Sequence, residues 1–173
     1  MRLKTKGGKR GFTLIELVIS ITIFVILAVV LVLRFGDYYY KRNLQDDSLK
    51  IAFALKSSRD KAISQEGGTP WGIHFVNTSG AQGYYIIFSG PAYAGQIFPK
   101  TELNPGVQFL MPVASSTVNI VFLNPFFSAT STYATPFTMN GVLAATTSII
   151  IALTDDETSS STIIINANGD VQY

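Results

Sequence analysis

The sequence predicts an α+β protein: a long N-terminal α-helix, transmembrane in its first half and amphipathic in its second, packed on a C-terminal antiparallel β-sheet or small β-sandwich. Three observations predict this fold class. Residues 12–33 form an apolar run with one charge, and no proline occurs between residues 12 and 69. After residue 70, short β-branched and aromatic runs alternate with turn residues. The first two features indicate a long helix, and the third indicates several short strands.

The composition excludes several classes of protein. With 47% hydrophobic and only 14% charged residues, the chain is too apolar to be intrinsically disordered. Its mean hydropathy is +0.31, and its 173 residues allow one ordinary domain plus an appendage. The absence of cysteine excludes disulfide scaffolds, cysteine zinc sites, iron–sulfur clusters and thiol catalysis.

The charges divide the chain near its N-terminus. The first ten residues carry five basic side chains and no acidic one, whereas from Phe12 onward 11 acidic residues outnumber 8 basic ones. A basic flank stays on the cytoplasmic side of a membrane span. We therefore expect a single-pass protein of the inner (cytoplasmic) membrane, with a cytoplasmic N-terminus and an extracytoplasmic C-terminal domain.

The apolar run, residues 12–33, allows three interpretations. As a helix it would be about 33 Å long, which spans a bilayer. A cleaved secretory signal peptide has an apolar region of about 7–15 residues followed by a small-residue cleavage site, and the sequence Leu31–Phe35 offers no such site. A plain signal anchor fits the length. The third interpretation concerns Gly11, which precedes the run, and Glu16, which lies inside it.

Glu16 needs a partner or a role, because an unpaired carboxylate inside a membrane costs about 2.5–3.5 kcal/mol even on an insertion scale. No lysine or arginine lies within the span. Cleavage after Gly11 would create a new α-amino group at Phe12. The amine of another copy, one step along an assembly, could then pair with the Glu16 carboxylate.

The junction Gly11–Leu17, which reads GFTLIEL after a short basic leader, resembles the class III signal of type IV pilins and type II secretion pseudopilins. The resemblance implies the pilin fold and a structural subunit that is not an enzyme and needs no cofactor. It also implies that a prepilin peptidase cleaves between Gly11 and Phe12 and that the Phe12 amine is N-methylated. Glu16 would then set the assembly register against a neighbouring subunit.

The implied partners are prepilin peptidase, other pilin or pseudopilin subunits, the inner-membrane assembly platform and the membrane itself. The implied destinations are a cell-surface pilus or a periplasmic pseudopilus. The expected segments are a cleaved basic leader, a transmembrane and filament-core helix, an amphipathic helix and a β-rich extracytoplasmic domain, at residues 1–11, 12–33, 34–66 and 67–173.

The amphipathic segment carries a narrow apolar stripe at the helical period. The residues of this stripe are Leu44, Ser48, Ile51, Leu55 and Ala62. The charged residues expected to lie largely off the stripe are Lys41, Arg42, Asp46, Asp47, Lys50, Lys56, Arg59 and Lys61. The stripe is interpreted as the face that packs on the chain's own β-domain, and Tyr38–Tyr40 are placed at the membrane interface. Residues 67–70, Gly-Gly-Thr-Pro, end the helix.

A second resemblance covers the end of the helix. The helical segment Ser58–Ile63, a short loop and a strand that opens with Trp71-Gly72 are similar to the GspH/FimT-like branch of minor pilins and pseudopilins. Major pilins often carry a proline near the end of the apolar run, and this chain has none there. Both features favour a minor subunit.

Strands are predicted after residue 70. They are Trp71–Val76, Tyr84–Phe88, Val107–Met111, Val118–Leu123, Ser148–Leu153 and Thr162–Ile165. The turn signal Asn168-Gly169 is expected to fold Val171 and Tyr173 back on the last of these. Asn124-Pro125 is expected to form a turn, and Ser128–Thr132 an exposed loop.

No catalytic residue is predicted. His74 is the only histidine and is interpreted as structural. Asp155, Asp156 and Glu157 are candidate calcium ligands because calcium prefers oxygen ligands, and major pseudopilins use a calcium loop. They lack a spaced ligand pattern, so a solvated hairpin tip is preferred and no metal is expected. Asn77-Thr78-Ser79 matches a glycosylation sequon by pattern only.

Nucleic acid is not expected as a partner, although some pilins of the FimT branch bind DNA. Binding to phosphates needs a basic surface. Residues 62–173 carry one lysine and no arginine against six acidic residues. The competing hypothesis from another class is an uncleaved single-pass, signal-anchored surface protein with a β-rich binding domain.

Overall fold

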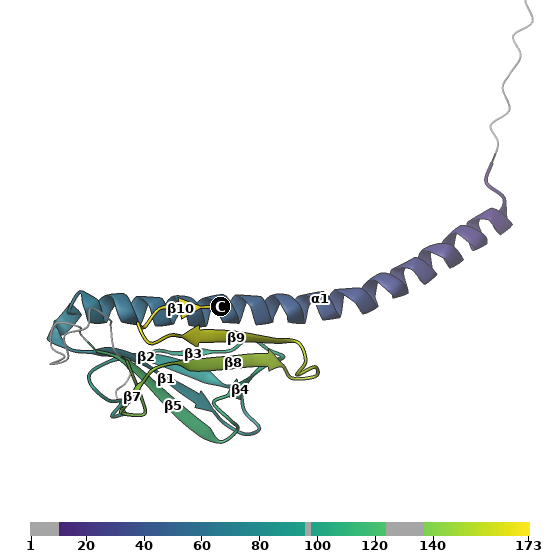
Figure 1. Ribbon diagram of the computed structural model, residues 1–173. Helices are drawn as coiled ribbons and strands as arrows, with labels where there is room; N and C mark the ends of the chain where they lie inside the picture. Colours follow the sequence, from purple (N-terminus) through teal and green to yellow (C-terminus); the bar gives the residue numbers. More distant parts are fainter. Residues whose placement is uncertain (1–10, 96–97, 124–136) are drawn as a thin grey trace, which may run out of the picture. The chain divides into compact units, whose positions relative to one another are not determined.

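The computed structural model describes residues 11–95, 98–123 and 137–173 (Figure 1). Three predictions fall outside these residues: the basic leader that precedes Gly11, the Asn124-Pro125 turn and the Ser128–Thr132 loop. The chain forms two compact units, of which the first ends at Tyr38 and the second begins at Tyr39.

The helix α1 runs from Leu14 to Ile63 and contributes to both units. From Leu14 to Leu31 its large apolar side chains are exposed. The segment Leu14–Leu31 has a mean hydropathy of 3.0, and none of it is buried within the chain. By length and composition this segment can cross a membrane.

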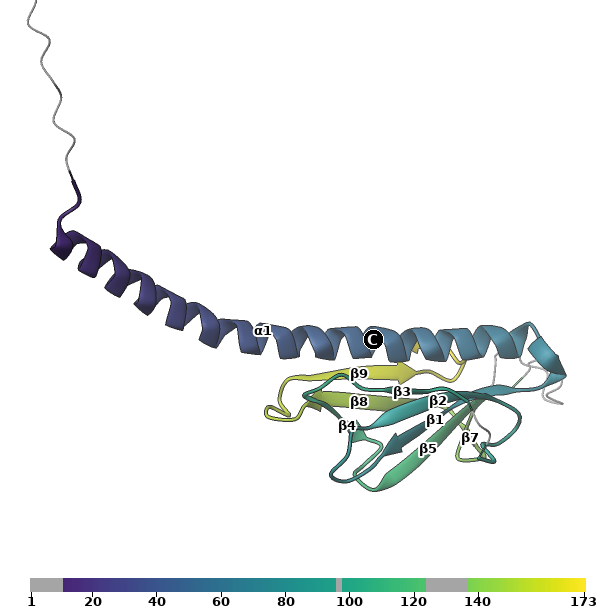
Figure 2. The same cartoon turned by 180° about the vertical axis from the view of Figure 1, so that it is seen from behind.

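The second unit contains the rest of α1 and two antiparallel sheets, which lie on the same side of this part of the helix (Figures 1 and 2). The elements after α1 are η1 Glu66–Gly68, β1 Trp71–Asn77, β2 Tyr84–Ser89, β3 Lys100–Glu102, β4 Val107–Met111, β5 Ser116–Phe122, β6 Phe137–Met139, β7 Val142–Ala144, β8 Thr147–Leu153, β9 Ser160–Ile165 and β10 Val171–Gln172. One sheet has the order β3-β2-β1-β5-β6-β7 and the other β10-β9-β8-β4. The α+β prediction is confirmed, with the sheets forming a small sandwich.

One hydrophobic core joins the helix to both sheets. The predicted stripe on the helix is buried in full, including the polar Ser48, whose hydroxyl lies 2.8 Å from that of Ser161 in β9. In β1 the residues Ile73 and Phe75 are fully buried, whereas His74 and Val76 between and after them are only partly buried, as expected for a half-buried strand. Helix and sheets therefore share a single interior.

Asp47 corrects the sequence analysis. It was expected among the charged residues that lie off the stripe, but its side chain is only 2% exposed. It lies three residues after Leu44 and four before Ile51, and this spacing places it on the buried face of the helix. Its hydrogen-bond partner Asn104, on the β3–β4 loop, makes its burial possible.

All six predicted strands are present, and Val171 pairs with Ile165 as the Asn168-Gly169 turn predicts. The three-residue strands β3, β6 and β7 were not predicted. Gly72 in β1 is required by close packing, because a Cβ there would lie 2.5 Å from the carbonyl oxygen of Ile120.

The helix end forms a compact corner. α1 stops at Ile63, and the predicted glycines follow in η1 with positive φ angles. The indole N–H of Trp71 donates to the carbonyl of Glu66 at 2.8 Å. The Lys61 ammonium lies 4.1 Å from the Trp71 ring centroid and 3.5 Å from the Glu66 carboxylate. These contacts fix the entry of the chain into β1.

Candidate functional site: the N-terminal junction

The first turn of α1 is capped by Thr13. The backbone N–H of Glu16 donates to the Thr13 hydroxyl at 3.3 Å, and the N–H of Leu17 donates to the Thr13 carbonyl at 3.2 Å. Thr13 therefore satisfies donors that a helix start leaves unpaired. The spacing Thr-x-x-Glu is that of a capping box, so the helix begins two residues after Phe12.

Gly11 and Phe12 lie in the open. Phe12 is 77% exposed, and a Cβ added at Gly11 would meet no atom within 4 Å. Neither residue is held by packing within the described chain. The fold itself therefore does not require a glycine at position 11.

Glu16 is exposed in the first turn of the helix, where the helix dipole favours a negative charge. Among the ion pairs between described residues, none involves Glu16. The hydroxyls that follow it are satisfied locally: Ser20 donates to the Glu16 carbonyl and Thr22 to the Val18 carbonyl, both at 2.8 Å. Unlike the hydroxyls of Ser20 and Thr22, the Glu16 carboxylate can therefore pair with a group outside the described chain.

Residues 6–32 match the prokaryotic N-terminal methylation motif. No solved structure matches the chain. The matched residues include the Gly11-Phe12 junction, the capped first turn and most of the apolar helix, and they end before the β-domain.

The fold and the junction define an α+β protein with a class III prepilin signal and an N-terminal helix that is apolar enough to span a membrane. The chain therefore carries a prepilin-type methylation motif at the start of a long helix that continues into a pilin-like α+β domain. The signal implies processing by prepilin peptidase and assembly with other pilins.

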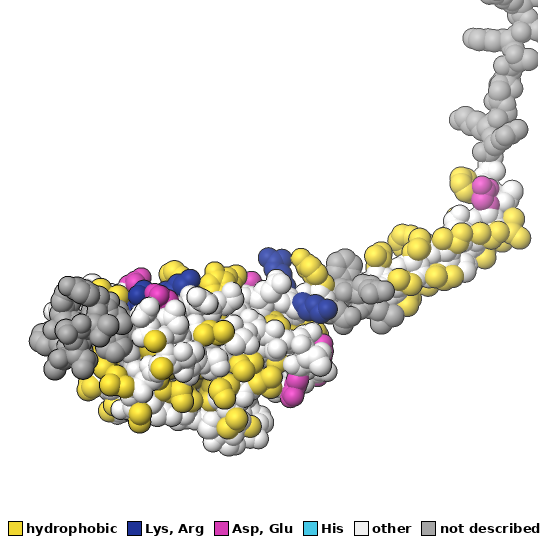
Figure 3. Space-filling view, viewed as in Figure 1, with side chains coloured by type: hydrophobic (Ala, Val, Ile, Leu, Met, Phe, Trp, Pro, Cys, Tyr) yellow, Lys and Arg dark blue, Asp and Glu magenta, His cyan; other side chains and the backbone are white. Residues whose placement is uncertain are grey.

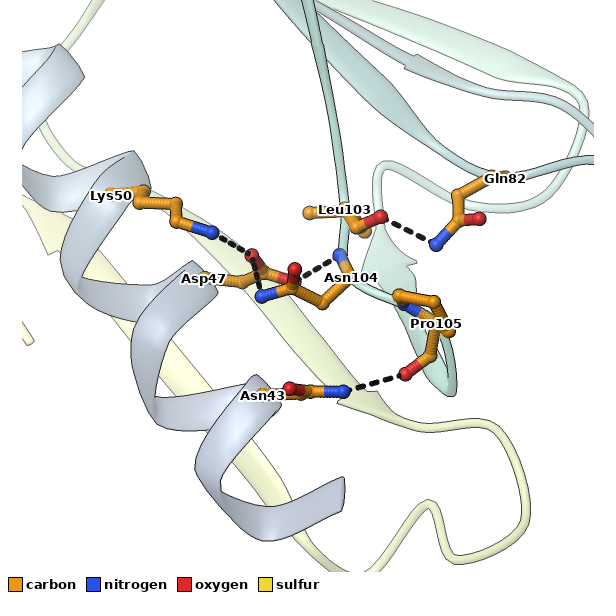
Figure 4. A network of polar contacts seen from close by, with 7 residues as sticks. All are labelled: Asn43, Asp47, Lys50, Gln82, Leu103, Asn104 and Pro105. Atoms are coloured by element: carbon orange, nitrogen blue, oxygen red, sulfur yellow. Dashed lines mark hydrogen bonds and ion pairs between the residues drawn. The ribbon is translucent and has the colours of Figure 1, made fainter. Parts of the chain in front are cut away.

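A second polar cluster, the Asp47 clamp, ties the helix to the β3–β4 loop (Figure 4). The Asp47 carboxylate accepts the backbone N–H of Asn104 at 2.6 Å and the Asn104 side-chain amide at 2.9 Å. Lys50 lies 3.3 Å from the same carboxylate, and Asn43 donates to the carbonyl of Pro105 at 3.1 Å. The clamp therefore joins two successive turns of α1 to the β3–β4 loop.

Burial raises the pKa of Asp47 above its ordinary value of 3.8, and this effect outweighs the lowering by Asn104 and Lys50. Asp46 on the same helix adds a further small increase. The hydrogen bonds from Asn104 and the ion pair with Lys50 therefore offset only part of the desolvation cost of the carboxylate, which is typical of a buried ionised group.

His74 and Asn77 have structural surroundings. His74 Nδ1 lies 2.6 Å from the side-chain oxygen of Asn119, and its ring stacks on Tyr93 with centroids 4.1 Å apart. Asn77 is buried, and its amide donates to the carbonyls of Phe109 and Pro112 at 3.0 and 2.8 Å. In the folded domain the Asn77 nitrogen is therefore not available for glycosylation.

The candidate calcium residues lie at the β8–β9 hairpin. Asp156 accepts hydrogen bonds from Ser159 and Thr158, which lower its pKa. Glu157 accepts one from Gln108 at 3.1 Å. Among the described residues there is no group of three or more histidine, cysteine, aspartate or glutamate side chains that could hold a metal ion.

Two residues of interest were not assigned roles from the sequence. Thr13 caps the helix, and its spacing to Glu16 was the available signal. Asp47 anchors the domain to the helix, and its place on the apolar stripe was the available signal. The identity of its partner, Asn104, was not readable because the two lie 57 positions apart.

Proposed function

We propose that prepilin peptidase cleaves between Gly11 and Phe12, and that the mature chain begins at an N-methylated Phe12. It is then assembled through its N-terminal helix into a type IV pilus or a type II secretion pseudopilus. Assembly proceeds from the inner membrane at its assembly platform. The observation that carries the proposal is the match of residues 6–32 to the methylation motif.

The surroundings of Gly11 support a processing site. Because a side chain at position 11 would meet nothing within 4 Å, the glycine serves something other than the packing of this chain. A peptidase that must accommodate the junction in its active site provides that reason. Phe12 is exposed and lies next to a capped helix start, so the junction is not covered by packing within the described residues.

Glu16 sets the register of assembly in this proposal. The Glu16 carboxylate has no ion pair within the described chain, and the new Phe12 amine supplies a positive charge on each neighbour. In a membrane, pairing the two removes the cost of about 2.5–3.5 kcal/mol for an isolated carboxylate.

We further propose that the chain is a minor subunit of the GspH/FimT-like branch. The corner in which Lys61 and Trp71 meet is built from the two segments that resemble that branch. The close approach of the Ile120 backbone to Gly72 explains why a glycine follows Trp71. The absence of a proline near the end of the apolar run also favours a minor subunit.

The N-terminal mass of the membrane-extracted protein tests the processing step, in cells that contain an active prepilin peptidase. We expect a chain that starts at N-methylated Phe12. Gly11→Val should leave the leader attached, whereas Gly8→Val, which changes a leader glycine away from the junction, should be cleaved normally. A wild-type chain that keeps residues 1–11 would refute the proposal and favour an uncleaved surface anchor.

A further inference from the structure

An apolar surface lies where the ends of β4 and β6 meet β5 and β8. Met111 and Val113 at the end of β4 and Met139 at the end of β6 line a common hollow of about 160 Å³. Val142 of β7 pairs with Met139 and is 71% exposed, and Val113 is 61% exposed. We call these four residues the apolar rim.

The hollow inside the rim is suited to one large apolar side chain. Its remaining walls include Val118 and Ile149 from the two sheets. An apolar cavity of about 150 Å³ can hold a benzene ring, so a single phenyl or branched aliphatic group fits this space. Met139 is held in place by the Thr147 hydroxyl, 3.0 Å from its sulfur.

The residues of the rim come from an uncharged stretch of the sequence. No lysine, arginine, aspartate or glutamate occurs from Leu103 to Thr154, the stretch that supplies every residue of the rim. In the view of Figure 3 the charged side chains of the second unit lie along α1 and at one end of the sandwich, and the rest of the sandwich is apolar or neutral. A partner surface must therefore also be uncharged, because an unpaired charge buried against the rim would lose its hydration.

The two outer strands of the six-stranded sheet, β3 and β7, differ in whether they carry charged side chains. β3 carries Lys100 and Glu102, paired at 2.6 Å, and charged side chains are a common protection of an outer strand. β7 carries Val142 and Leu143, both more than two-thirds exposed. One edge of the sheet is thus protected from association and the other is not.

The size of the rim restricts the kind of partner. Four partly exposed side chains offer a few hundred Å² of apolar surface, in the range of functional patches, but a stable interface buries about 800 Å² on each partner. A freely diffusing partner would therefore bind weakly. A partner tethered nearby gains an effective concentration in the millimolar range without further contacts.

We propose that the apolar rim is the docking surface for the β-domain of a neighbouring subunit that carries its own class III helix in the same membrane or filament. This inference rests on the proposed function and names the partner surface for it. The partner contributes an uncharged segment with one large apolar side chain that enters the hollow. Because the rim and the inserted side chain are different surfaces, the contact can repeat along a filament.

Photocrosslinking of the full chain in its native host tests the proposal. A benzophenone amino acid is placed at Val142, on the face of β7 that pairs with Met139, or at Leu143, on the opposite face. The two positions are adjacent and equally exposed, so they form a matched pair. We expect a crosslinked adduct from position 142 and little from position 143, and mass spectrometry should identify the captured chain as a processed prepilin-type subunit.

Val142→Lys and Leu143→Lys provide the second arm. Both add one positive charge to the same exposed strand, but only Val142→Lys should reduce the amount of chain recovered in sheared filaments, by about tenfold. Thermal unfolding of the two variants should match the wild type. An adduct with a chain lacking a class III signal, equal crosslinking from both positions, no adduct from position 142, or wild-type assembly of Val142→Lys would overturn the proposal.

The proposed function can be judged separately in the same cells. If wild-type chains begin at Phe12 and are found in filaments while Val142→Lys assembles normally, the rim is not the docking surface and the pilin function stands. If wild-type chains are absent from filaments, the proposed function itself fails.

Discussion

Replacing Asp47 with alanine tests whether the Asp47 clamp stabilises the second unit. The substitution removes the acceptor of two hydrogen bonds from Asn104, at 2.6 and 2.9 Å. Hydrogen bonds to a charged group contribute about 1.5–3 kcal/mol each, and a buried donor left unpaired costs about 1–3 kcal/mol. Removing a buried carboxylate also relieves part of its desolvation cost.

The balance of these effects gives a loss of about 3 kcal/mol for Asp47→Ala. For a domain of this size that corresponds to a decrease of roughly 10 °C in melting temperature. Asn104→Ala should cost only about 1 kcal/mol, because its backbone N–H still reaches the carboxylate. The double variant should therefore be less destabilised than the sum of the two single variants, by about 1 kcal/mol.

The assay is unfolding of the full chain in detergent, followed by the fluorescence of Trp71, the single tryptophan of the sequence. Trp71 lies at the corner between helix and sheet and should report their separation. A loss below about 0.5 kcal/mol for Asp47→Ala, or full additivity of the two substitutions, would refute the reasoning.

The pH dependence of the clamp follows from the raised pKa of Asp47. Burial raises this pKa in the folded state above the ordinary value of 3.8, so the folded protein binds the proton more tightly than the unfolded chain. The resulting stabilisation is fully present below about pH 3.8 and is lost as pH rises through the folded-state pKa. Asp47→Asn, which does not titrate, should therefore be more destabilising at pH 3.5 than at pH 7; an equal cost at both would show that burial does not dominate.

Three further predictions concern other parts of the chain. Glu16→Leu should leave membrane insertion normal but reduce filament recovery at least tenfold, and wild-type recovery would contradict its proposed role in register. Gly72→Ala should lower the free energy of unfolding by about 2–3 kcal/mol, because the new methyl meets the Ile120 carbonyl at 2.5 Å; an unchanged urea midpoint would refute that contact. Asp170→Asn should change the free energy of unfolding by less than about 0.5 kcal/mol despite its 2.9 Å ion pair with Arg59, because exposed pairs contribute little.

The elements that produce a repeating sequence pattern, the helix and the longer strands, could be predicted from the sequence. The apolar run, the missing prolines and the stripe through Ile51 and Leu55 predicted the helix and its buried face. The longer strands were predicted because five or more residues are enough to display β-branched runs between turn signals.

Features that depend on distant partners or very short segments were not readable. The strands β3, β6 and β7 have three residues each, too few for an alternating pattern. A charge such as Asp47 is normally exposed, and only the position of Asn104 in the folded chain explains its burial. The apolar rim is likewise formed by residues from separate segments, so it could not be predicted from any single stretch of the sequence.

The candidate site, unlike the Asp47 clamp and the apolar rim, could be predicted from the sequence. Gly11, Phe12 and Glu16 lie within one short stretch, and in the proposed function each of them acts on another protein rather than on the rest of this chain. The sequence motif therefore carries most of the information about them. The structure adds the Thr13 cap and the lack of packing around Gly11.

The shared core of helix and sheets has a mechanical consequence. Because the buried stripe of α1 from Leu44 to Ala62 packs along the sandwich, tension applied to the helix at its Tyr39 end would load this interface in shear. Many contacts, including the Asp47 clamp, would then bear the load together instead of parting one after another. A pull on the Tyr39 end of α1 would therefore reach both sheets through the whole length of the buried stripe.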